Sequence, residues 1–128
     1  MPATAVLIDD SRTTRALLRV YLTEAGFKVV AEGERGEHAL DLYEKHHPTL
    51  MTLDIVLPGI DGVTAVRTLL ERHPEATVVM CSSINAREKV LACHEAGAAH
   101  YLLKPITAEK VQDLARKVLA RFRSAQTA

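Results

Sequence analysis

Apolar and polar positions alternate between two patterns along this chain. Short runs rich in apolar and β-branched residues predict strands, and longer segments with apolar residues at every third or fourth position predict helices with one buried face. The strand-like runs are 4–9, 27–33, 49–54, 76–83 and 99–104. The helix-like segments are 11–26, 36–47, 63–73, 86–97 and 107–123. We therefore expect five consecutive strand–helix units.

Residues at the ends of the helical segments support these boundaries. Gly26 and Gly97 each follow a helical segment, where glycine is common because it adopts a left-handed backbone without steric cost. Pro48 and Pro74 follow two others, and proline cannot continue a helix. Thr107 opens the last segment with a capping pattern.

Strands that alternate with helices predict an α/β fold in which helices cover both faces of a parallel sheet. The chain has 128 residues, which is the length of one domain. We expect a single domain over 1–128 with its core at 4–122. The polar segment 124–128 is expected to be a frayed tail.

Charge and hydropathy exclude several classes of protein. Sixteen basic residues balance sixteen acidic residues, so we expect no non-specific attraction to nucleic acid or to an anionic membrane. No apolar run approaches the ~20 residues of a membrane span. The N-terminal sequence lacks the basic region of a signal peptide, so a cytoplasmic protein is expected.

Cysteine and histidine positions give no strong metal signal. Cys81 and Cys93 lie in different predicted elements and form no CxxC pair. We interpret them as free thiols, with a disulfide or a metal pair as the alternative. The histidines lack metal-ligand spacing, so we interpret them as surface or cap residues; they are His38, His46, His47, His73, His94 and His100.

Polar residues that could take part in binding or catalysis stand at the ends of four of the five predicted strands. They are Asp9 and Asp10 after the first strand, Asp54 after the third, Ser82 and Ser83 after the fourth, and Lys104 with Pro105 after the fifth. In doubly wound sheets, ligands bind beyond the carboxyl ends of the strands. We therefore expect three carboxylates, a hydroxyl and an ammonium group to converge on one edge of the sheet.

Three neighbouring carboxylates need a balancing positive charge. Mg²⁺ is a hard cation that takes a few carboxylates, waters and a phosphate oxygen as ligands. The ammonium of Lys104 suits a phosphate, and the hydroxyl of Ser82 can donate one hydrogen bond to it. A carboxylate can itself act as a nucleophile and become an aspartyl phosphate. The pattern thus indicates a site for a cation and a phosphoryl group.

The motifs "LIDDS", "LDIVLPGIDG", "VVMCSS" and "YLLKP" together resemble the receiver domain of bacterial two-component response regulators, of the chemotaxis (CheY-like) type. The resemblance covers 4–122, and four motifs in the right order at the right strand ends make it specific. It implies a flavodoxin-like, doubly wound (βα)₅ fold with five parallel strands in the order 2-1-3-4-5.

The resemblance also implies roles for individual residues. Asp54 would be the phospho-acceptor, Asp10 would bind Mg²⁺ directly, and Asp9 would act largely through water. The backbone carbonyl of Val56 would be a further metal ligand. Asp61, in the loop that follows, is read as a turn residue.

On the other side of the expected site, Ser82 would be the switch hydroxyl, with Ser83 as the less favoured alternative. Lys104 would contact the phosphoryl group, and Pro105 would follow it through a cis peptide bond. Tyr101 matches the aromatic switch position of the family, although simple packing would also explain it.

Two positions depart from relatives that lose their phosphoryl group quickly. The residues two after the acceptor and two after the switch hydroxyl tune this loss in the family, and here they are Val56 and Ile84. Neither apolar side chain can orient an attacking water, so we expect slow dephosphorylation.

The function expected from the sequence is a signalling switch rather than an enzyme with an external substrate. A histidine kinase or phosphotransfer protein would phosphorylate Asp54, and a downstream protein would bind the 86–123 face. A weak dimer is compatible with this reading, whereas direct binding to nucleic acid or a membrane is not expected. The segment 124–128 favours a stand-alone regulator, and a receiver excised from a larger regulator is the alternative.

Two other functions fit the sequence poorly. An aspartyl-phosphate phosphatase of the haloacid-dehalogenase kind needs Asp-x-Asp-x-Thr after the first strand, where this chain has Asp9, Asp10 and Ser11. A nucleotide-binding Rossmann domain needs GxGxxG after that strand, and the motif is missing there.

Overall fold

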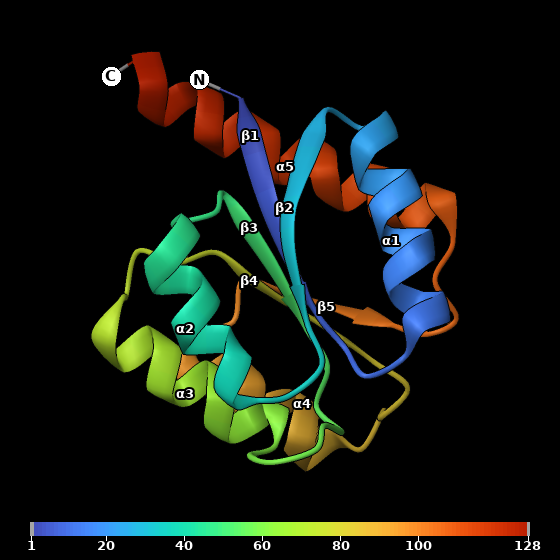
Figure 1. The fold of residues 1–128 in the computed structure, drawn as a ribbon, viewed down its shortest axis with the longest axis vertical. Helices are drawn as coiled ribbons and strands as arrows, with labels where there is room; N and C mark the ends of the chain where they lie inside the picture. Colours follow the sequence, from blue (N-terminus) through green and yellow to red (C-terminus); the bar gives the residue numbers. More distant parts are fainter. Residues whose placement is uncertain (1, 128) are drawn as a thin grey trace.

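A computed structural model describes residues 2–127 of the chain, with side chains for residues 2–126. Five strands form one parallel sheet with helices on both of its faces (Figure 1). The strands are β1 (Ala3–Ile8), β2 (Phe27–Gly33), β3 (Leu50–Leu53), β4 (Val78–Ser82) and β5 (His100–Leu103). The helices are α1 (Arg12–Glu24), α2 (Glu37–His46), α3 (Gly62–Arg72), α4 (Arg87–Ala96) and α5 (Ala108–Thr127).

The strand order is β2-β1-β3-β4-β5, which confirms the doubly wound fold. Helices α1 and α5 cover one face of the sheet, and α2, α3 and α4 cover the other (Figure 1). Successive side chains of a strand point to opposite faces. Ile8 therefore joins the apolar cluster under α2 and α3, whereas Leu7 joins the cluster under α1 and α5.

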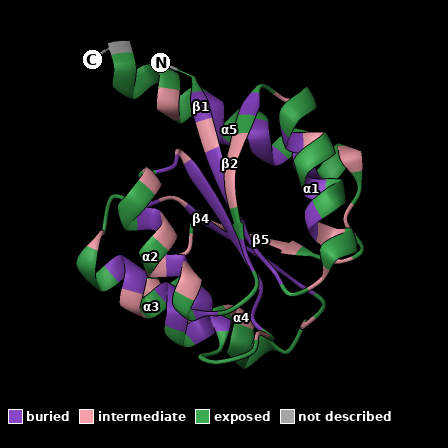
Figure 2. Ribbon diagram, in the orientation of Figure 1, coloured by how far each residue is buried: buried purple, intermediate pink, exposed green. Residues whose placement is uncertain are grey.

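Burial is greatest in the middle of the sheet. All residues of β3 and β4 are buried, whereas β5, which lies at an edge, has no buried residue (Figure 2). Continuous apolar strands are typical of a sheet covered on both faces. The carboxyl ends of β1, β3 and β4 thus emerge from the most deeply buried part of the sheet.

Local capping explains where several helices begin. The Oγ of Ser11 accepts a hydrogen bond from the Thr14 N–H at 3.2 Å, at the start of α1. Asp61 accepts one from the Thr64 N–H at 2.9 Å at the start of α3, so the expected turn residue is a helix cap. Such caps satisfy N–H groups that have no partner inside the helix.

The last helix differs from the expectation. Helix α5 continues to Thr127, so the segment predicted to fray is helical as far as the structure describes it, and Ala128 lies outside the described residues. Ala125 and Gln126 are good helix formers, and neither glycine nor proline interrupts this segment.

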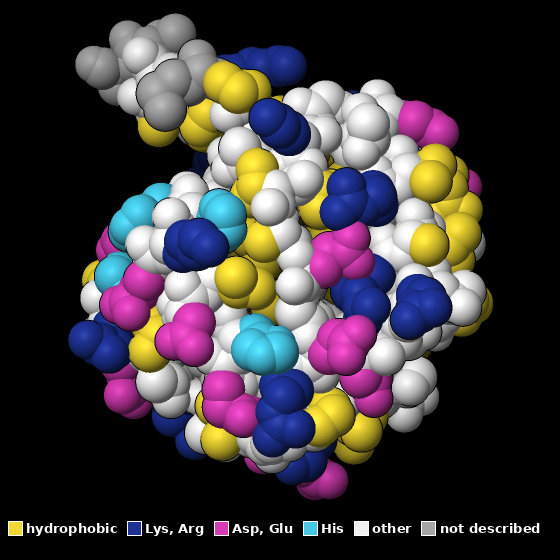
Figure 3. Space-filling view, in the orientation of Figure 1, with side chains coloured by type: hydrophobic (Ala, Val, Ile, Leu, Met, Phe, Trp, Pro, Cys, Tyr) yellow, Lys and Arg dark blue, Asp and Glu magenta, His cyan; other side chains and the backbone are white. Residues whose placement is uncertain are grey.

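Charged side chains of both signs are interspersed on the face that carries α1, β2 and α2 (Figure 3). This mixture agrees with the balanced composition of the chain. Among the described residues, no helix combines the length and the apolar character that crossing a membrane requires.

Candidate functional site

The ends of β1 and β3 bring three carboxylates together. Oxygen atoms of Asp9, Asp10 and Asp54 all lie within 4.8 Å of one another. Asp9 is 1% exposed and Asp54 is 5% exposed, whereas Asp10 lies at the surface. The structure thus forms the acidic edge that the strand pattern predicted.

Lys104 is the cation within this cluster. Its Nζ lies 3.0 Å from Asp9 Oδ2 and 3.0 Å from Asp54 Oδ2. Burial alone would lower the pKa of Lys104, but its interactions with the carboxylates of Asp9 and Asp54 outweigh this effect, so the pKa is raised. Lys104 is therefore fully charged at neutral pH, and it balances only part of the charge of three carboxylates.

The surroundings of Asp9 show that its charge is poorly compensated. Burial raises the pKa of Asp9, and the Ser11 N–H and Lys104 only partly oppose this effect. Asp9 Oδ1 accepts a hydrogen bond from the Ser11 N–H at 2.8 Å. Asp9 Oδ2 is buried without a hydrogen bond of regular geometry, although it forms the ion pair with Lys104. A buried carboxylate oxygen whose charge is only partly compensated fits a hard divalent cation such as Mg²⁺.

Asp54 is held by the backbone of two neighbouring segments. Its N–H donates to the Ile8 carbonyl at 3.1 Å, which fixes the end of β3 against β1. A side chain at Gly62 would lie only 1.9 Å from the Asp54 carbonyl oxygen, so α3 can begin this close only with glycine. Val56 follows in the same loop, is 59% exposed, and donates its N–H to Asp54 Oδ1 at 3.4 Å.

Ser82 and Tyr101 are linked through the loop after β4. Ser82 is fully buried and its Oγ accepts a hydrogen bond from the Ile84 N–H at 3.3 Å, whereas Ser83 is exposed. The Tyr101 hydroxyl donates to the Ile84 carbonyl. The half-buried Tyr101 side chain also packs against the core cluster on the α3 and α4 face, and burial raises the pKa of its hydroxyl.

The peptide bond between Lys104 and Pro105 is cis, as the resemblance implied. Lys110, on α5, donates from its Nζ to the carbonyls of Leu103 and Pro105 at 3.2 and 3.3 Å. Lys110 thus supports the segment that carries Lys104, a role that was not predicted from the sequence.

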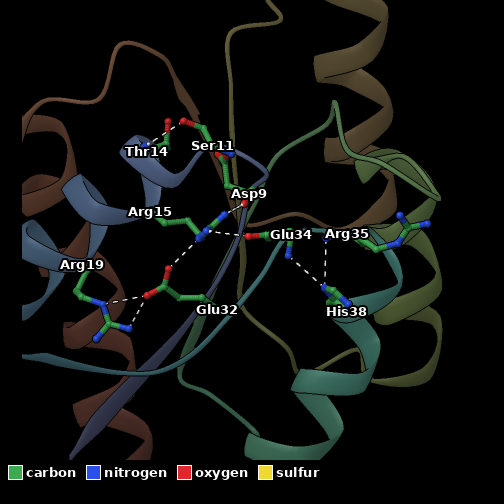
Figure 4. Close-up of polar contacts among 9 residues, drawn as sticks. All are labelled: Asp9, Ser11, Thr14, Arg15, Arg19, Glu32, Glu34, Arg35 and His38. Atoms are coloured by element: carbon green, nitrogen blue, oxygen red, sulfur yellow. Dashed lines mark hydrogen bonds and ion pairs between the residues drawn. The ribbon is translucent and has the colours of Figure 1, made fainter.

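A buried arginine beside the acidic edge was not predicted from the sequence. Arg15 on α1 is 7% exposed, and Figure 4 shows its guanidinium pointing at the carbonyl of Asp9 and at two glutamates of the β2 end. Arg15 lies 2.8 Å from Glu32 and 3.2 Å from Glu34, and it donates to the Asp9 carbonyl. Its spacing from the buried Leu18 was an available signal, because the two positions share the inner face of α1.

Both cysteines are free thiols, as interpreted from the sequence, and three of the histidines lie at helix ends. Cys81 and Cys93 are buried and free, and burial raises the pKa of Cys81 to about 12. His47 and His73 occupy the C-caps of α2 and α3. The Nδ1 of His38 accepts hydrogen bonds from two backbone N–H groups at the start of α2.

Comparison with known proteins agrees with the fold and with the acidic edge. A family model for the response regulator receiver domain matches residues 5–116. This chain therefore belongs to the receiver domains of two-component response regulators.

Individual relatives include short and long regulators. The chain is 34% identical over 114 residues to the chemotaxis protein CheY of Bacillus subtilis, a match that covers 89% of this chain and 95% of that protein. It is 38% identical over 117 residues to the transcriptional regulatory protein DegU of Brevibacillus brevis, covering 91% of this chain and 49% of that one.

A solved structure of a CheX–CheY–BeF₃–Mg complex from Borrelia burgdorferi is also similar. Its TM-score is 0.88 at 30% identity, and the match covers 93% of this chain and 90% of that one.

Proposed function

We propose that this receiver domain is a phosphorylation-dependent switch in which Asp54 accepts a phosphoryl group from the phosphohistidine of a histidine kinase or phosphotransfer protein. The observation that carries the proposal is the placement of one buried carboxylate, Asp54, at a strand end, 3.0 Å from a lysine and within 4.8 Å of two further carboxylates. A structural carboxylate would need only one partner, whereas this arrangement concentrates charge at one edge of the sheet.

Asp10, Asp54 and the Val56 carbonyl would hold Mg²⁺ directly, and Asp9 would contribute through water. The residues present fit this ion because the ligands that the site offers are all oxygen atoms, and they include the buried Asp9 Oδ2, whose partner is the ion pair with Lys104. When bound, the ion would neutralise negative charge on the carboxylates and on the incoming phosphoryl oxygens.

The chain's own part in the transfer is nucleophilic attack and positioning. An Asp54 carboxylate oxygen forms a bond to phosphorus while the phosphorus–nitrogen bond of phosphohistidine breaks, and the electron pair returns to the imidazole nitrogen. Lys104 donates to a phosphoryl oxygen from its position beside Asp54 Oδ2. Catalysis of this reaction rests mainly on positioning and charge, which agrees with a site built from fixed strand ends.

The response to phosphorylation would pass through Ser82 and Tyr101. The Ser82 hydroxyl, which accepts a bond from the Ile84 N–H, would turn to the phosphoryl group. Because Tyr101 donates to the carbonyl of the same Ile84, a shift of this loop would move the ring and change the 86–123 face. That face would then bind a downstream protein.

The chain is proposed to act as a stand-alone, chemotaxis-type regulator in the cytoplasm, over 1–128, with a core at 4–122. The high coverage of CheY of Bacillus subtilis supports this reading. A receiver domain from a larger regulator is the second candidate, because DegU of Brevibacillus brevis is about twice as long. In either case the domain would catalyse only its own phosphorylation and dephosphorylation, without direct binding to nucleic acid or a membrane. A weak dimer would also be compatible with this function.

Intact-protein mass spectrometry after incubation with acetyl phosphate and Mg²⁺ tests the proposal. One phosphoryl group should be added to the wild-type chain and none to Asp54→Asn. Asp61→Asn is the matched control, because Asp61 is a cap in the next loop and its amide retains an acceptor oxygen. Equal labelling of Asp54→Asn and wild type would refute the assignment of Asp54.

A further inference from the structure

We infer that Arg15 is a positioning residue that fixes the Asp9–Asp10 peptide and thereby aims the Asp10 carboxylate into the acidic site. The inference rests on the proposed function, because it concerns the affinity of this site for Mg²⁺. It adds a residue from α1, outside the strand ends, to the machinery of the site.

The Asp9 backbone is held on both of its polar groups. Its N–H donates to the Gly33 carbonyl of β2 at 3.0 Å, and its carbonyl oxygen accepts from Arg15. The side chain is fixed separately through the Ser11 N–H. The Asp9 carbonyl belongs to the peptide unit that leads into Asp10, so the guanidinium of Arg15 sets the orientation of that unit.

Asp10 depends on this peptide because its own side chain is otherwise unsupported. Asp10 is exposed, and within the described part of the chain no residue gives its carboxylate a hydrogen bond or an ion pair. A metal ligand whose conformation is not fixed before binding loses conformational entropy when it binds the cation. Arg15 removes part of that penalty at the backbone of the preceding residue.

Arg15 is itself held in place from β2. Its Nε lies 2.8 Å from Glu32 Oε1 and its Nη2 lies 3.2 Å from Glu34 Oε1. Burial would raise the pKa of Glu32, but hydrogen bonds from Arg19 and Arg15 outweigh it, so the pKa is lowered and Glu32 stays ionised. The planar guanidinium can bind two carboxylates and a carbonyl at once, which the single ammonium of lysine cannot do in the same geometry.

Charge alone predicts the opposite effect of removing Arg15. A positive group near the site repels Mg²⁺. A purely electrostatic role would therefore make Arg15→Gln, which removes the positive charge, bind the ion more tightly. The affinity of Arg15→Lys, which keeps the charge, would be unchanged. A positioning role predicts that both variants bind the ion more weakly. The sign of the change therefore separates the two explanations.

Titration calorimetry of the full chain with Mg²⁺ tests the inference. Arg15→Lys should bind Mg²⁺ about 10-fold more weakly than wild type, which is the lower end for residues that support metal ligands. Arg19→Lys is the matched control, because Arg19 shares Glu32 with Arg15 but makes no contact with Asp9 among the interactions of the described residues. Its affinity should equal that of wild type.

A second pair of variants keeps the test open if Arg15→Lys folds poorly. Glu34 is a largely exposed anchor of Arg15, so Glu34→Ala should fold and bind Mg²⁺ several-fold more weakly. Glu37→Ala removes the same charge without touching Arg15 and should show a smaller loss.

The outcomes distinguish this inference from the proposed function. If wild type binds Mg²⁺ and Asp10→Asn does not, the proposed metal site stands. Arg15→Lys binding as tightly as wild type, or Arg15→Gln binding more tightly, would then overturn the positioning role alone. If wild type failed to bind Mg²⁺, the metal site and the positioning role would both be wrong.

Discussion

The β1–α1–β2 side of the molecule is packed more firmly than the side formed by α4 and β5. Helix α1 begins at the capping Ser11 and buries Leu18 and Leu22 as well as Arg15. Helix α4 begins at Ala86 without a side-chain cap and has only Cys93 as a buried residue. Strand β1 lies inside the sheet between β2 and β3, whereas β5 lies at the sheet edge and its last residue, Leu103, is exposed.

This difference in packing indicates that the two sides have different roles. The firmly packed side positions Asp9 and Asp10, whose charges have to be held at fixed places. The thinly packed side carries Tyr101 and the predicted partner surface, and segments that change conformation are drawn from regions of low local stability. Asp54 directly follows β3 and Ser82 is the last residue of β4, so both lie at the ends of the two fully buried strands between these sides.

The largest expected effect compares one leucine from each side. Leu22 on α1 is fully buried and Leu91 on α4 is 48% exposed. Leu22→Ala should reduce the free energy of unfolding by about 3 kcal/mol through lost burial and a cavity. Leu91→Ala should change it by less than about 0.5 kcal/mol. Denaturant titration gives both values, and equal losses would remove the contrast between the two helices.

A smaller effect is expected at the helix starts. Ser11→Ala removes the acceptor for the Thr14 N–H and should reduce the free energy of unfolding by about 1 kcal/mol. Ala86 is exposed with an extended backbone suited to a cap. Ala86→Ser should therefore increase the stability by a few tenths to about 1 kcal/mol. The comparison fails if Ala86→Ser is neutral in thermal melts while Ser11→Ala is damaging.

The lifetime of the phosphoryl group should respond to Val56. Val56→Asn introduces an amide that can orient an attacking water, so loss of the phosphoryl group should become several-fold faster. Val20→Asn is the matched control, because Val20 is 50% exposed on α1 and Val56 is 59% exposed beside the acceptor. Decay followed by mass spectrometry should be unchanged in the control, and an unchanged rate in Val56→Asn would contradict the role of this position.

The smallest expected effect is a dependence of stability on pH through Glu32. Its pKa in the folded chain lies below the ordinary value of 4.5, because the hydrogen bonds from Arg19 and Arg15 outweigh burial. A lowered carboxyl pKa stabilises the fold above pH 4.5, and this contribution is lost as the pH falls through the folded-state pKa. Glu32→Gln should thus be less stable than wild type at pH 7, by up to about 1 kcal/mol. A difference in stability between Glu32→Gln and wild type that stayed constant down to acid pH would argue against the ion pairs of Glu32.

The sequence predicted the strand–helix order and the acidic edge because both depend on local patterns. Hydrophobic spacing reports elements directly, and parallel strands necessarily present Asp9 and Asp54 at the same edge. Arg15 was not predicted, because an arginine on a helix is usually exposed and its carboxylate partners come from β2. The bond from Tyr101 to Ile84 depends on the shape of a loop, which spacing does not encode. The helical segment after Arg123 was missed because polar composition was taken as a sign of fraying.

We expect phosphorylation of Asp54, beside the carboxylates of Asp9 and Asp10, to control the conformation of α4 and β5. The most direct measurement is amide NMR of the chain with Mg²⁺, before and after addition of beryllofluoride. Beyond the site itself, resonances should shift most from Ser82 to Tyr101 and least in α1 and β2, and Asp54→Asn should show no such shift. Shifts of equal size in Asp54→Asn, or changes centred on α1, would contradict this expectation.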